Sequence, residues 1–556
     1  MPARDRLTDA DAIARLRAKD ATLFAEDAAG RDEIAQRLGW VDLASSPVAV
    51  GLAASAKSLA KEARSQGITD VVLLGMGGSS LAALVMDEVL AAESCGARLH
   101  VLDTVSPVTI ARALEETNPA TTLHLVSSKS GTTIETTTLY AIFRERADRV
   151  LGAGVAGSRF IAITDPDTPL AHFAAEANFR ALVLAPANVG GRFSALTAFG
   201  ILPAALAGAD IDLIFERAAA AETACSAPAD ENPAVELAAF IEDSREAGAD
   251  KLTLVAPKEL RALGLWIEQL VAESLGKVGQ GVVPVVELAE EPAGLGPDRA
   301  IVVVRMSGDA RLAEWAAAQR GRFGVFEIVL DDAYDIAEEF VVWEHAVALV
   351  GSLMGVNPFD QPNVAEAKDA TLVVLESAAE VPSATVAFDG IHVTFAGALP
   401  EPTHQERSIA TALGHAIASL GAGDYIALLA YLPNDDQLLE PLTSAVPAVA
   451  SATGAAFCFE LGPRYLHSTG QLHKGGPDNG VFVLVTNRDA VDLEVPGHAW
   501  SLKTLHRAQA LGDLAALIGH DRRVLWLDLP DASEASVRRL AEALLDGAGV
   551  VHEPLS

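Results

Sequence analysis

The stretch Val71–Ala82 constrains the fold more than any other part of this sequence. Its four apolar residues, Val71–Leu74, predict a buried strand of the kind found in parallel sheets covered on both faces. A glycine-rich turn follows, and Ser79 then leads into a helical pattern over Leu81–Leu90. Glycines allow close backbone approach and a helix start offers unpaired amides, so the turn suits a phosphate or a carboxylate. A tight strand-to-helix turn without a ligand explains the stretch equally well.

Alternating strand and helix patterns continue along most of the chain. They predict an α/β fold with two doubly wound parallel sheets and a third, smaller α/β domain. The expected parts are an N-terminal helical arm over 1–44, a first domain over 45–230, a second over 231–378 and a third over 379–556. The further strand patterns cover residues 99–102, 123–128, 160–164, 251–255, 282–286, 300–304, 326–330, 425–431, 455–460, 481–486 and 524–528.

Charge and cysteine spacing narrow the function classes. A formal net charge of −34 disfavours nucleic acid and anionic membranes as partners, because both would repel the chain. Cys95, Cys225 and Cys458 are far apart, which predicts buried thiols in a reducing compartment. The first residues lack the apolar core of a secretion signal, and the apolar stretch 193–209 is shorter than the roughly 20 residues of a membrane span. We therefore expect a cytoplasmic protein and predict a buried helix at 193–209.

A second strand-to-helix junction, Ser127–Thr136, is crowded with hydroxyl groups. The hydroxyls of this junction could donate to phosphate oxygens, together with the first amides of the following helix; they belong to Ser128, Ser130, Thr132 and Thr133. An ordinary helix cap explains one of these hydroxyls well but not all of them. Two such junctions at the carboxyl ends of neighbouring strands favour a phosphate site, because ligands of open α/β sheets bind at those ends.

Two charged residues could carry chemistry beside such a site. Arg192 follows a Gly-Gly pair, so its guanidinium could approach an anion closely, although a solvated arginine on a turn is the simpler interpretation. Glu273 shares a helical stripe with Trp266 and Leu270, whereas Glu268 faces elsewhere. A carboxylate on a buried face suits a general base, but a buried structural ion pair fits the position equally well.

Two later segments add weaker signals. In the proline-bounded turn 355–368, Gln361 and Lys368 could reach one pocket if a helix begins near Asn363. The segment 466–477 contains two histidines, a lysine and three glycines. Its spacing fits no zinc pattern, so acid–base work or contacts to sugar hydroxyls are expected there rather than a metal.

Together these motifs resemble the phosphoglucose isomerase family, which is built from sugar-isomerase (SIS) domains. The resemblance rests on Leu74–Ser80, Ser128–Thr136, Val189–Ser194, Ala272–Lys277, Asn357–Pro362 and Leu466–Gln471, and covers about residues 45–370 besides the last of these segments. It is strongest to the isomerase part of bacterial transaldolase/isomerase fusions. The fold it implies is a pair of flavodoxin-like SIS domains.

The resemblance also implies an activity: interconversion of glucose 6-phosphate and fructose 6-phosphate in glycolysis and gluconeogenesis, without a cofactor or a metal. It makes Glu273 the base that moves a proton between carbons 1 and 2, and Arg192 the group that stabilises the enediolate. His467 and Lys368 would assist ring opening. The sugar phosphate group would be held by Gly78, Ser79, Ser128, Lys129, Ser130, Thr133 and Gln361, and the substrate would also contact Gly191 and Gln269.

Two alternatives concern the histidine segment and the activity. In the family this segment precedes the Asn-Pro-Phe-Asp-Gln segment, whereas here His467 comes after it. Either the chain order is rearranged around one site, or His473 or Lys474 opens the ring. The histidine could come from a neighbouring subunit, which would make a homodimer.

The competing functions are another SIS isomerase, acting on mannose or amino-sugar phosphates, and a sugar-phosphate sensor. Glu273 and Arg192 favour an enzyme over a sensor.

Overall fold

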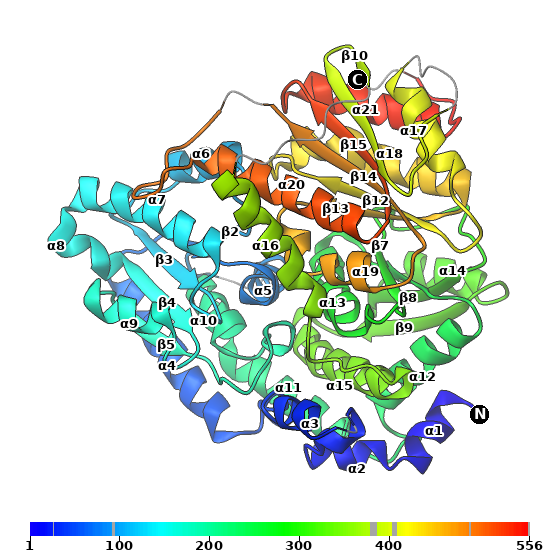
Figure 1. Cartoon of the computed structure of the whole chain (residues 1–556). Helices are drawn as coiled ribbons and strands as arrows, with labels where there is room; N and C mark the ends of the chain where they lie inside the picture. Colours follow the sequence, from blue (N-terminus) through cyan, green and yellow to red (C-terminus); the bar gives the residue numbers. More distant parts are fainter. Residues whose placement is uncertain (26, 92–94, 378–385, 403–407, 489–490, 554–556) are drawn as a thin grey trace.

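The computed structural model describes residues 1–25, 27–91, 95–377, 386–402, 408–488 and 491–553. Figure 1 shows three sheets with helices between and around them. The first sheet is parallel throughout, in the order β2-β1-β3-β4-β5. Its strands are β1 (Asp70–Leu74), β2 (Arg98–Leu102), β3 (Thr122–Ser127), β4 (Phe160–Thr164) and β5 (Ala181–Leu184). Of these strands only β5 was not predicted; it lies at an edge of the sheet and alternates between more and less exposed positions.

The second sheet is also parallel, in the order β7-β6-β8-β9. Its strands are β6 (Lys251–Val255), β7 (Val283–Val286), β8 (Arg299–Met306) and β9 (Gly324–Leu330). Continuous apolar runs such as the one in β8 are buried because helices cover both faces of a parallel sheet. The prediction of two doubly wound parallel sheets is confirmed.

The third sheet is mixed, in the order β10-β11-β15-β14-β12-β13. Its parallel strands β12 (Tyr425–Ala430), β13 (Ala456–Leu461), β14 (Gly480–Asn487) and β15 (Arg523–Leu529) match the predicted ones. The antiparallel hairpin β10 (Val386–Phe388) and β11 (Ile391–Gly397) was not predicted. Asp389 and Gly390 form its turn with positive φ, and an Asp-Gly pair is a hairpin signal that could have revealed it.

The helices of the described residues connect and cover these sheets. They are α1 (Ala3–Asp9), α2 (Ala12–Arg17), α3 (Ala28–Ala35), α4 (Pro47–Ser65), α5 (Leu81–Val89), α6 (Pro107–Glu116), α7 (Ile134–Leu151), α8 (Ala153–Ala156), α9 (Pro169–Glu176), α10 (Ala198–Ala207), α11 (Ile211–Ala224), α12 (Pro233–Glu246), α13 (Arg261–Leu275), α14 (Ala310–Gln319), α15 (Ile336–Met354), α16 (Pro362–Ser377), α17 (Ile409–Ala418), α18 (Asp436–Thr453), α19 (Gly470–Gly475), α20 (Leu502–Gly519) and α21 (Glu534–Gly547).

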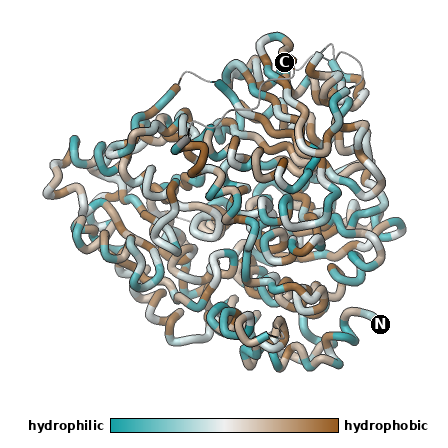
Figure 2. Tube along the Cα trace, in the orientation of Figure 1, coloured by the Kyte–Doolittle hydropathy of each residue, from teal (hydrophilic) through white to brown (hydrophobic). Residues whose placement is uncertain are grey.

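The apolar core runs through the first two sheets without a break. One cluster of buried side chains includes Leu73 from β1, Trp266 from α13 and Val302 from β8. The third sheet has a cluster of its own around Leu428 and shares another with β7 of the second sheet. Figure 2 shows the hydrophobic segments gathered in the interior strands and in the helices beside them. The predicted boundaries at 44/45 and 230/231 stay predictions, and the one at 378/379 falls outside the described residues.

Three helices lie close to the segments that were predicted to carry chemistry. Helix α10 is buried along its whole length, as predicted for this apolar stretch. Helix α13 is buried on nearly every side, so both Glu268 and Glu273 are buried. The two carboxyl groups face different surroundings, because Glu268 lines a separate cavity and Glu273 pairs with Arg192. Helix α16 lies along α20 (Figure 1) and leads from the second sheet to the third.

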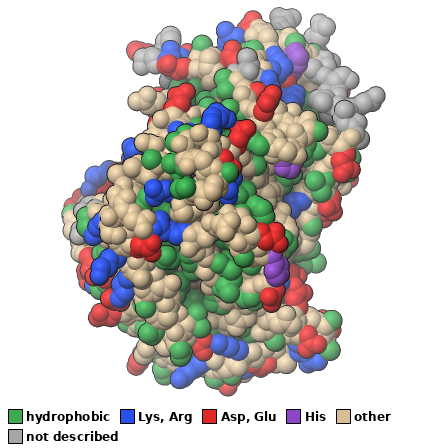
Figure 3. Space-filling view, turned by 90° about the vertical axis from the view of Figure 1, so that its left-hand side faces the viewer, with side chains coloured by type: hydrophobic (Ala, Val, Ile, Leu, Met, Phe, Trp, Pro, Cys, Tyr) green, Lys and Arg blue, Asp and Glu red, His purple; other side chains and the backbone are tan. Residues whose placement is uncertain are grey.

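Of the three cysteines, Cys225 and Cys458 are buried, whereas Cys95 is exposed. This corrects the prediction that all three are buried; the physical reason is that Cys95 lies in the connection before β2 rather than in an element of the core. None of the described helices is long and apolar enough to cross a membrane. On the face shown in Figure 3, acidic and basic side chains are interspersed among the residues drawn in colour.

Candidate functional site

The glycine turn after β1 is packed against two other turns of the chain. It forms the short 3-10 turn η2 (Gly77–Ser79), which contacts η5 (Gly191–Phe193) and η8 (Arg464–His467). A Cβ on Gly78 would lie 2.1 Å from the carbonyl oxygen of Gly191, so only glycine fits there. The glycines of this turn were predicted to allow another group to come close to the backbone. In the structure, the groups that come close are the neighbouring turns η5 and η8.

The hydroxyl-rich junction between β3 and α7 is ordered by its own hydrogen bonds. The hydroxyls of Ser128 and Thr133 are 2.9 Å apart, and those of Ser130 and Thr132 are 3.0 Å apart. Thr133 is the N-cap of α7 but its side chain accepts no capping bond, so the helix start is open to an anion. This arrangement supports the predicted phosphate site.

A cavity of about 190 Å³ lies next to this junction. It brings together groups from the first sheet, from α16 and from the third unit of the chain. An ammonium and an imidazole beside several hydroxyls make the lining suited to a phosphorylated sugar. The polar lining residues are Ser130, Thr132, Thr133, Glu135, Lys368, Thr371, His467 and Gln509.

Not every predicted phosphate ligand lines this cavity. The ammonium of Lys129 forms an ion pair with Asp165 instead, so its side chain is turned to the neighbouring strand end. Gly78 and Ser79 lie in the adjoining turn, where the carbonyl oxygen of Ser79 accepts a hydrogen bond of 2.9 Å from Ser127. The geometry therefore joins the two predicted loops but places Ser130 and Thr133 nearest the cavity.

Arg192 and Glu273, predicted on separate segments, meet as a buried pair. The Nη1 atom of Arg192 lies 3.5 Å from Oε1 of Glu273, and the two residues are 4% and 8% exposed. Further acceptors hold the guanidinium in place: Ser274 at 2.8 Å from Nε and Gln361 at 3.0 Å from Nη1. A fixed fork of donors beside a carboxylate is a geometry that can stabilise a developing oxyanion.

Gln269 connects this pair to the histidine segment. One turn before Glu273 on α13, its Nε2 atom lies 3.4 Å from Oε2 of Glu273 and donates to the carbonyl oxygen of His467 at 2.7 Å. The helix spacing of four residues puts both side chains on one face. Gln269 therefore links the carboxylate to the segment that carries the imidazole.

The imidazole of His467 is held by a carboxylate that was not predicted to belong to the site. Oε1 of Glu135 accepts a hydrogen bond from Nε2 of His467 at 2.8 Å and another from Gln509 at 2.6 Å. Burial alone would raise the pKa of Glu135, but the charge and hydrogen bond of His467 outweigh it and lower that pKa. The position of Glu135 within the hydroxyl-rich motif was the available signal; nothing local marked Gln509.

The two alternatives to His467 are paired with other residues. Lys474 donates to Asp513 at 2.7 Å, and Glu460 accepts from His473 at 3.0 Å, with all four side chains buried. Neither lines the cavity beside the hydroxyl junction. Of the three candidates, His467 is thus the one that the structure brings to the other site residues, although it lies later in the chain than the Asn-Pro-Phe-Asp-Gln segment.

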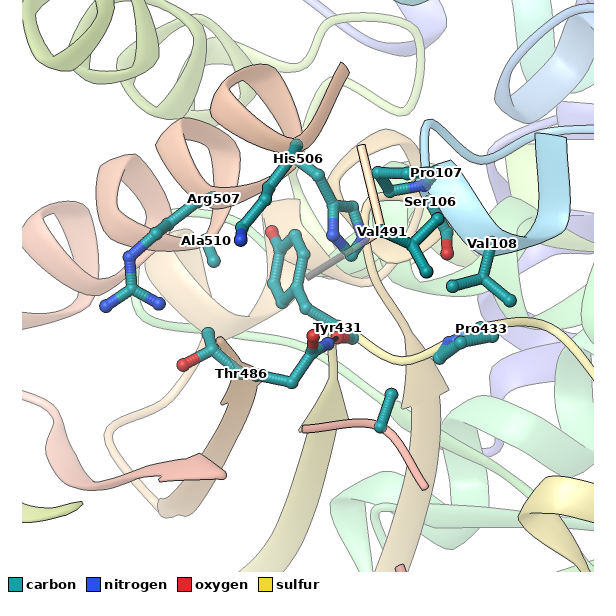
Figure 4. A pocket seen from close by; sticks show the side chains of 13 residues that line it. Ser106, Pro107, Val108, Tyr431, Pro433, Thr486, Val491, His506, Arg507 and Ala510 are labelled. Carbon is teal, nitrogen blue, oxygen red and sulfur yellow. Dashed lines mark hydrogen bonds between the residues drawn. The ribbon is translucent and has the colours of Figure 1, made fainter. Parts of the chain in front are cut away.

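A different small cavity lies at the carboxyl ends of β12 and β14 (Figure 4). Tyr431 and His506 line it, with their rings 5.3 Å apart. Its volume of about 20 Å³ is room for a single water molecule and not for a sugar phosphate. Among the described residues, no group of three or more His, Cys, Asp and Glu side chains is arranged to hold a metal ion.

Known proteins match a part of this chain. The family described as phosphoglucose isomerase matches residues 55–287. The glucose-6-phosphate isomerase of Rubrobacter xylanophilus is 29% identical over 362 residues, covering 56% of this chain and 84% of the relative. That of Symbiobacterium thermophilum is 31% identical over 354 residues, covering 54% and 79%, and that of Thermus thermophilus is 34% identical over 255 residues, covering 45% and 58%.

Solved structures share the fold. A hypothetical protein from Thermus thermophilus matches with a TM-score of 0.59 and 27% identity, covering 67% of this chain and 97% of that one. A glucose-6-phosphate isomerase from Chlamydia trachomatis matches with a TM-score of 0.52 and 19% identity, covering 66% and 79%. The family is shown by the sequence relatives. The Chlamydia trachomatis structure, at 19% identity, supports the fold alone. The chain belongs to the glucose-6-phosphate isomerase family.

Proposed function

We propose that this chain is an aldose–ketose isomerase that interconverts glucose 6-phosphate and fructose 6-phosphate. The observation that carries the proposal is the buried contact between Glu273 and Arg192, 3.5 Å apart, which Gln269 links to the segment of His467. A base, a fixed cation and an anion site are the parts that this reaction needs. The family of its relatives supports the same activity.

The phosphate of the sugar would be bound at the start of α7. Ser130 and Thr133 would donate hydroxyl hydrogen bonds, together with the open amides of the helix. Lys368 from α16 would add a positive charge to the lining of the same cavity. Lys129 would act through its backbone, because its ammonium is paired with Asp165.

Proton transfer would be the work of Glu273. Its carboxylate takes the proton from carbon 2 of the open-chain aldose, and the electron pair of that bond forms an enediolate. The same carboxyl group returns the proton to carbon 1, and the proton of the carbon-2 hydroxyl moves to the oxygen on carbon 1, which gives the ketose without net gain or loss of electrons. Arg192 stabilises the negative oxygen in between, and its bonds to Ser274 and Gln361 keep the guanidinium from having to reorganise.

Ring opening would be the work of His467. Because Nε2 is bound to Glu135, Nδ1 is the nitrogen left to exchange a proton with the ring oxygen or hydroxyl. The lowered pKa of Glu135 keeps that carboxylate ionised, which fixes the tautomer and the orientation of the ring. Lys368 lies in the same cavity and would assist this step.

The deciding test is Glu273→Gln, which keeps the size of the side chain and removes the base. Turnover of fructose 6-phosphate, coupled to a glucose-6-phosphate dehydrogenase, should fall on the order of a hundred- to ten-thousandfold. Binding of the substrate, measured by calorimetry, should persist. Glu344→Gln is the matched control, because Glu344 is a buried carboxyl of α15 outside this site.

Near-normal turnover of Glu273→Gln would exclude Glu273 as the base. Mannose 6-phosphate and an amino-sugar phosphate are tested in parallel with the wild-type chain. Faster turnover of either one would show that the chain has another specificity within the same reaction class.

A further inference from the structure

Behind α13 lies a cavity of about 560 Å³ that the isomerase mechanism does not use. Its walls come from α5 and β2 of the first sheet region, from α13 and β7 of the second, and from α18 and β13 of the third. Figure 1 shows α5, α13 and β2 near the centre of the molecule. A volume of this size is typical of sites for small organic molecules.

The lining combines apolar walls with an excess of acid. Leu99, Val101, Leu265, Leu439 and Phe459 contribute apolar surface. Six carboxyl residues face three cationic ones around the same cavity, and a lining with this balance favours a positively charged ligand. The carboxyl residues are Asp87, Glu88, Glu268, Asp436, Glu440 and Glu460, and the cationic ones are Lys258, Arg261 and Arg464.

Glu268 distinguishes this cavity from an acidic surface patch. It is only 8% exposed, and among the described residues its carboxyl group has no hydrogen-bond or ion-pair partner. Its charged neighbours are already paired. Arg464 is bound to Asp103 at 2.6 and 3.0 Å, and Glu460 accepts from Thr469 at 2.6 Å. A buried carboxyl group without a partner is costly to ionise, so a cationic ligand would supply the missing counter-charge.

The pKa shifts of two lining carboxyl groups are consistent with a buried, unpartnered Glu268. Burial, together with the nearby charge of Glu460, raises the pKa of Glu268 well above its usual range. Burial, with the charge of Glu88, raises the pKa of Asp87 to about 6. Arg464 opposes the shift at Glu268 only partly, because its charge is shared with Asp103. A bound cation would oppose this shift and favour ionisation of Glu268.

We propose that this cavity binds a small organic amine, with its ammonium group against Glu268 and its apolar body against the leucine and phenylalanine walls. A sugar phosphate does not fit this lining, because the excess of carboxyl groups would repel the phosphate. A metal ion does not fit either, because the carboxyl groups are not clustered as ligands among the described residues. The site is separate from the cavity that holds His467 and Lys368.

The probes are n-hexylamine and its neutral counterpart 1-hexanol, titrated into the full chain by calorimetry. The amine should bind more tightly by roughly ten- to a hundredfold, the difference expected for a hydrogen bond to a charged partner. Glu268→Gln should remove that difference. Glu287→Gln is the matched control, because Glu287 is a buried carboxyl after β7 that does not line the cavity, and it should leave amine binding unchanged.

A second readout does not depend on any variant. If binding ionises Glu268, the wild-type chain should release protons when it binds the amine at pH 7, which repeated titrations in buffers of different ionisation enthalpy measure. Equal binding of hexanol and hexylamine, no binding of the amine, or no release of protons would each overturn the proposal. So would undiminished amine binding by a folded Glu268→Gln variant.

Discussion

Replacing Gln509 with leucine tests whether the third unit of the chain takes part in ring opening. The amide of Gln509 donates to the buried carboxylate of Glu135 at 2.6 Å, and Glu135 in turn holds His467 at 2.8 Å. Leucine keeps the approximate size of the side chain and removes the donor. Glu135 is then left with His467 as its side-chain partner, and the imidazole loses part of its fixed orientation.

The expected magnitude can be worked from this single bond. A hydrogen bond to a charged group contributes about 1.5–3 kcal/mol, and each 1.4 kcal/mol is a factor of about ten in rate. If the loss falls on ring opening, turnover of cyclic fructose 6-phosphate should drop roughly ten- to a hundredfold. Proton transfer at Glu273 should be nearly unaffected, because Gln509 makes no hydrogen bond to that carboxylate among the described contacts.

Two assays separate these steps. The coupled assay with fructose 6-phosphate measures the complete reaction, and proton exchange at carbon 2 of an aldose phosphate too short to cyclise measures the transfer step alone. Thr486→Val is the control, because it removes a buried 2.7 Å bond to Asp528 in the same unit but away from the site. Equal losses in both assays, or none in either, would refute the assignment of Gln509 to ring opening.

Three further substitutions test other parts of the structure. Arg192→Lys keeps a charge but loses the fork that binds Ser274, so turnover in the coupled assay should fall on the order of a hundredfold with the fold intact by circular dichroism. Gly78→Ala places a Cβ 2.1 Å from the oxygen of Gly191, so its melting temperature should drop clearly, while an alanine at exposed Gly51, where space is open, should not lower it. Glu287→Gln tests a buried carboxyl whose pKa burial raises to about 7. The contribution of Glu287 to wild-type stability should fall as the pH rises from about 4.5 to 7, because the folded state keeps the proton of Glu287 while the unfolded state loses it. By urea unfolding, the variant should match the wild type at about pH 4 and exceed it by about 3 kcal/mol at about pH 8. A difference that stays constant with pH would contradict the shift.

Proposals about assembly and location rest on the sequence alone. The homodimer and the cytoplasmic location stay predictions, and size-exclusion chromatography with light scattering would test the first. The position of His467 bears on the same question. It lines the site cavity of its own chain, so the site has its imidazole without a partner subunit.

The sequence by itself determined most of the sheet strands and both loops of the candidate site. Strands such as β1 and β3 could be predicted because unbroken apolar runs are the signature of strands covered on both faces. The hydroxyl-rich junction could be predicted because strand, cap residues and helix are neighbours in the chain. The edge strand β5 and the hairpin β10–β11 were missed because partly exposed strands carry a weaker pattern.

Only the tertiary structure decided which distant side chains meet. His467 contacts Glu135 across 332 positions, and Gln509 reaches the same carboxylate across 374. The tertiary structure also decided that Lys129 pairs with Asp165 and that Glu268 lines a separate cavity. The physical reason is that secondary structure depends on interactions between near neighbours in the chain, whereas the environment of a buried charge depends on how all the sheets and helices pack around it.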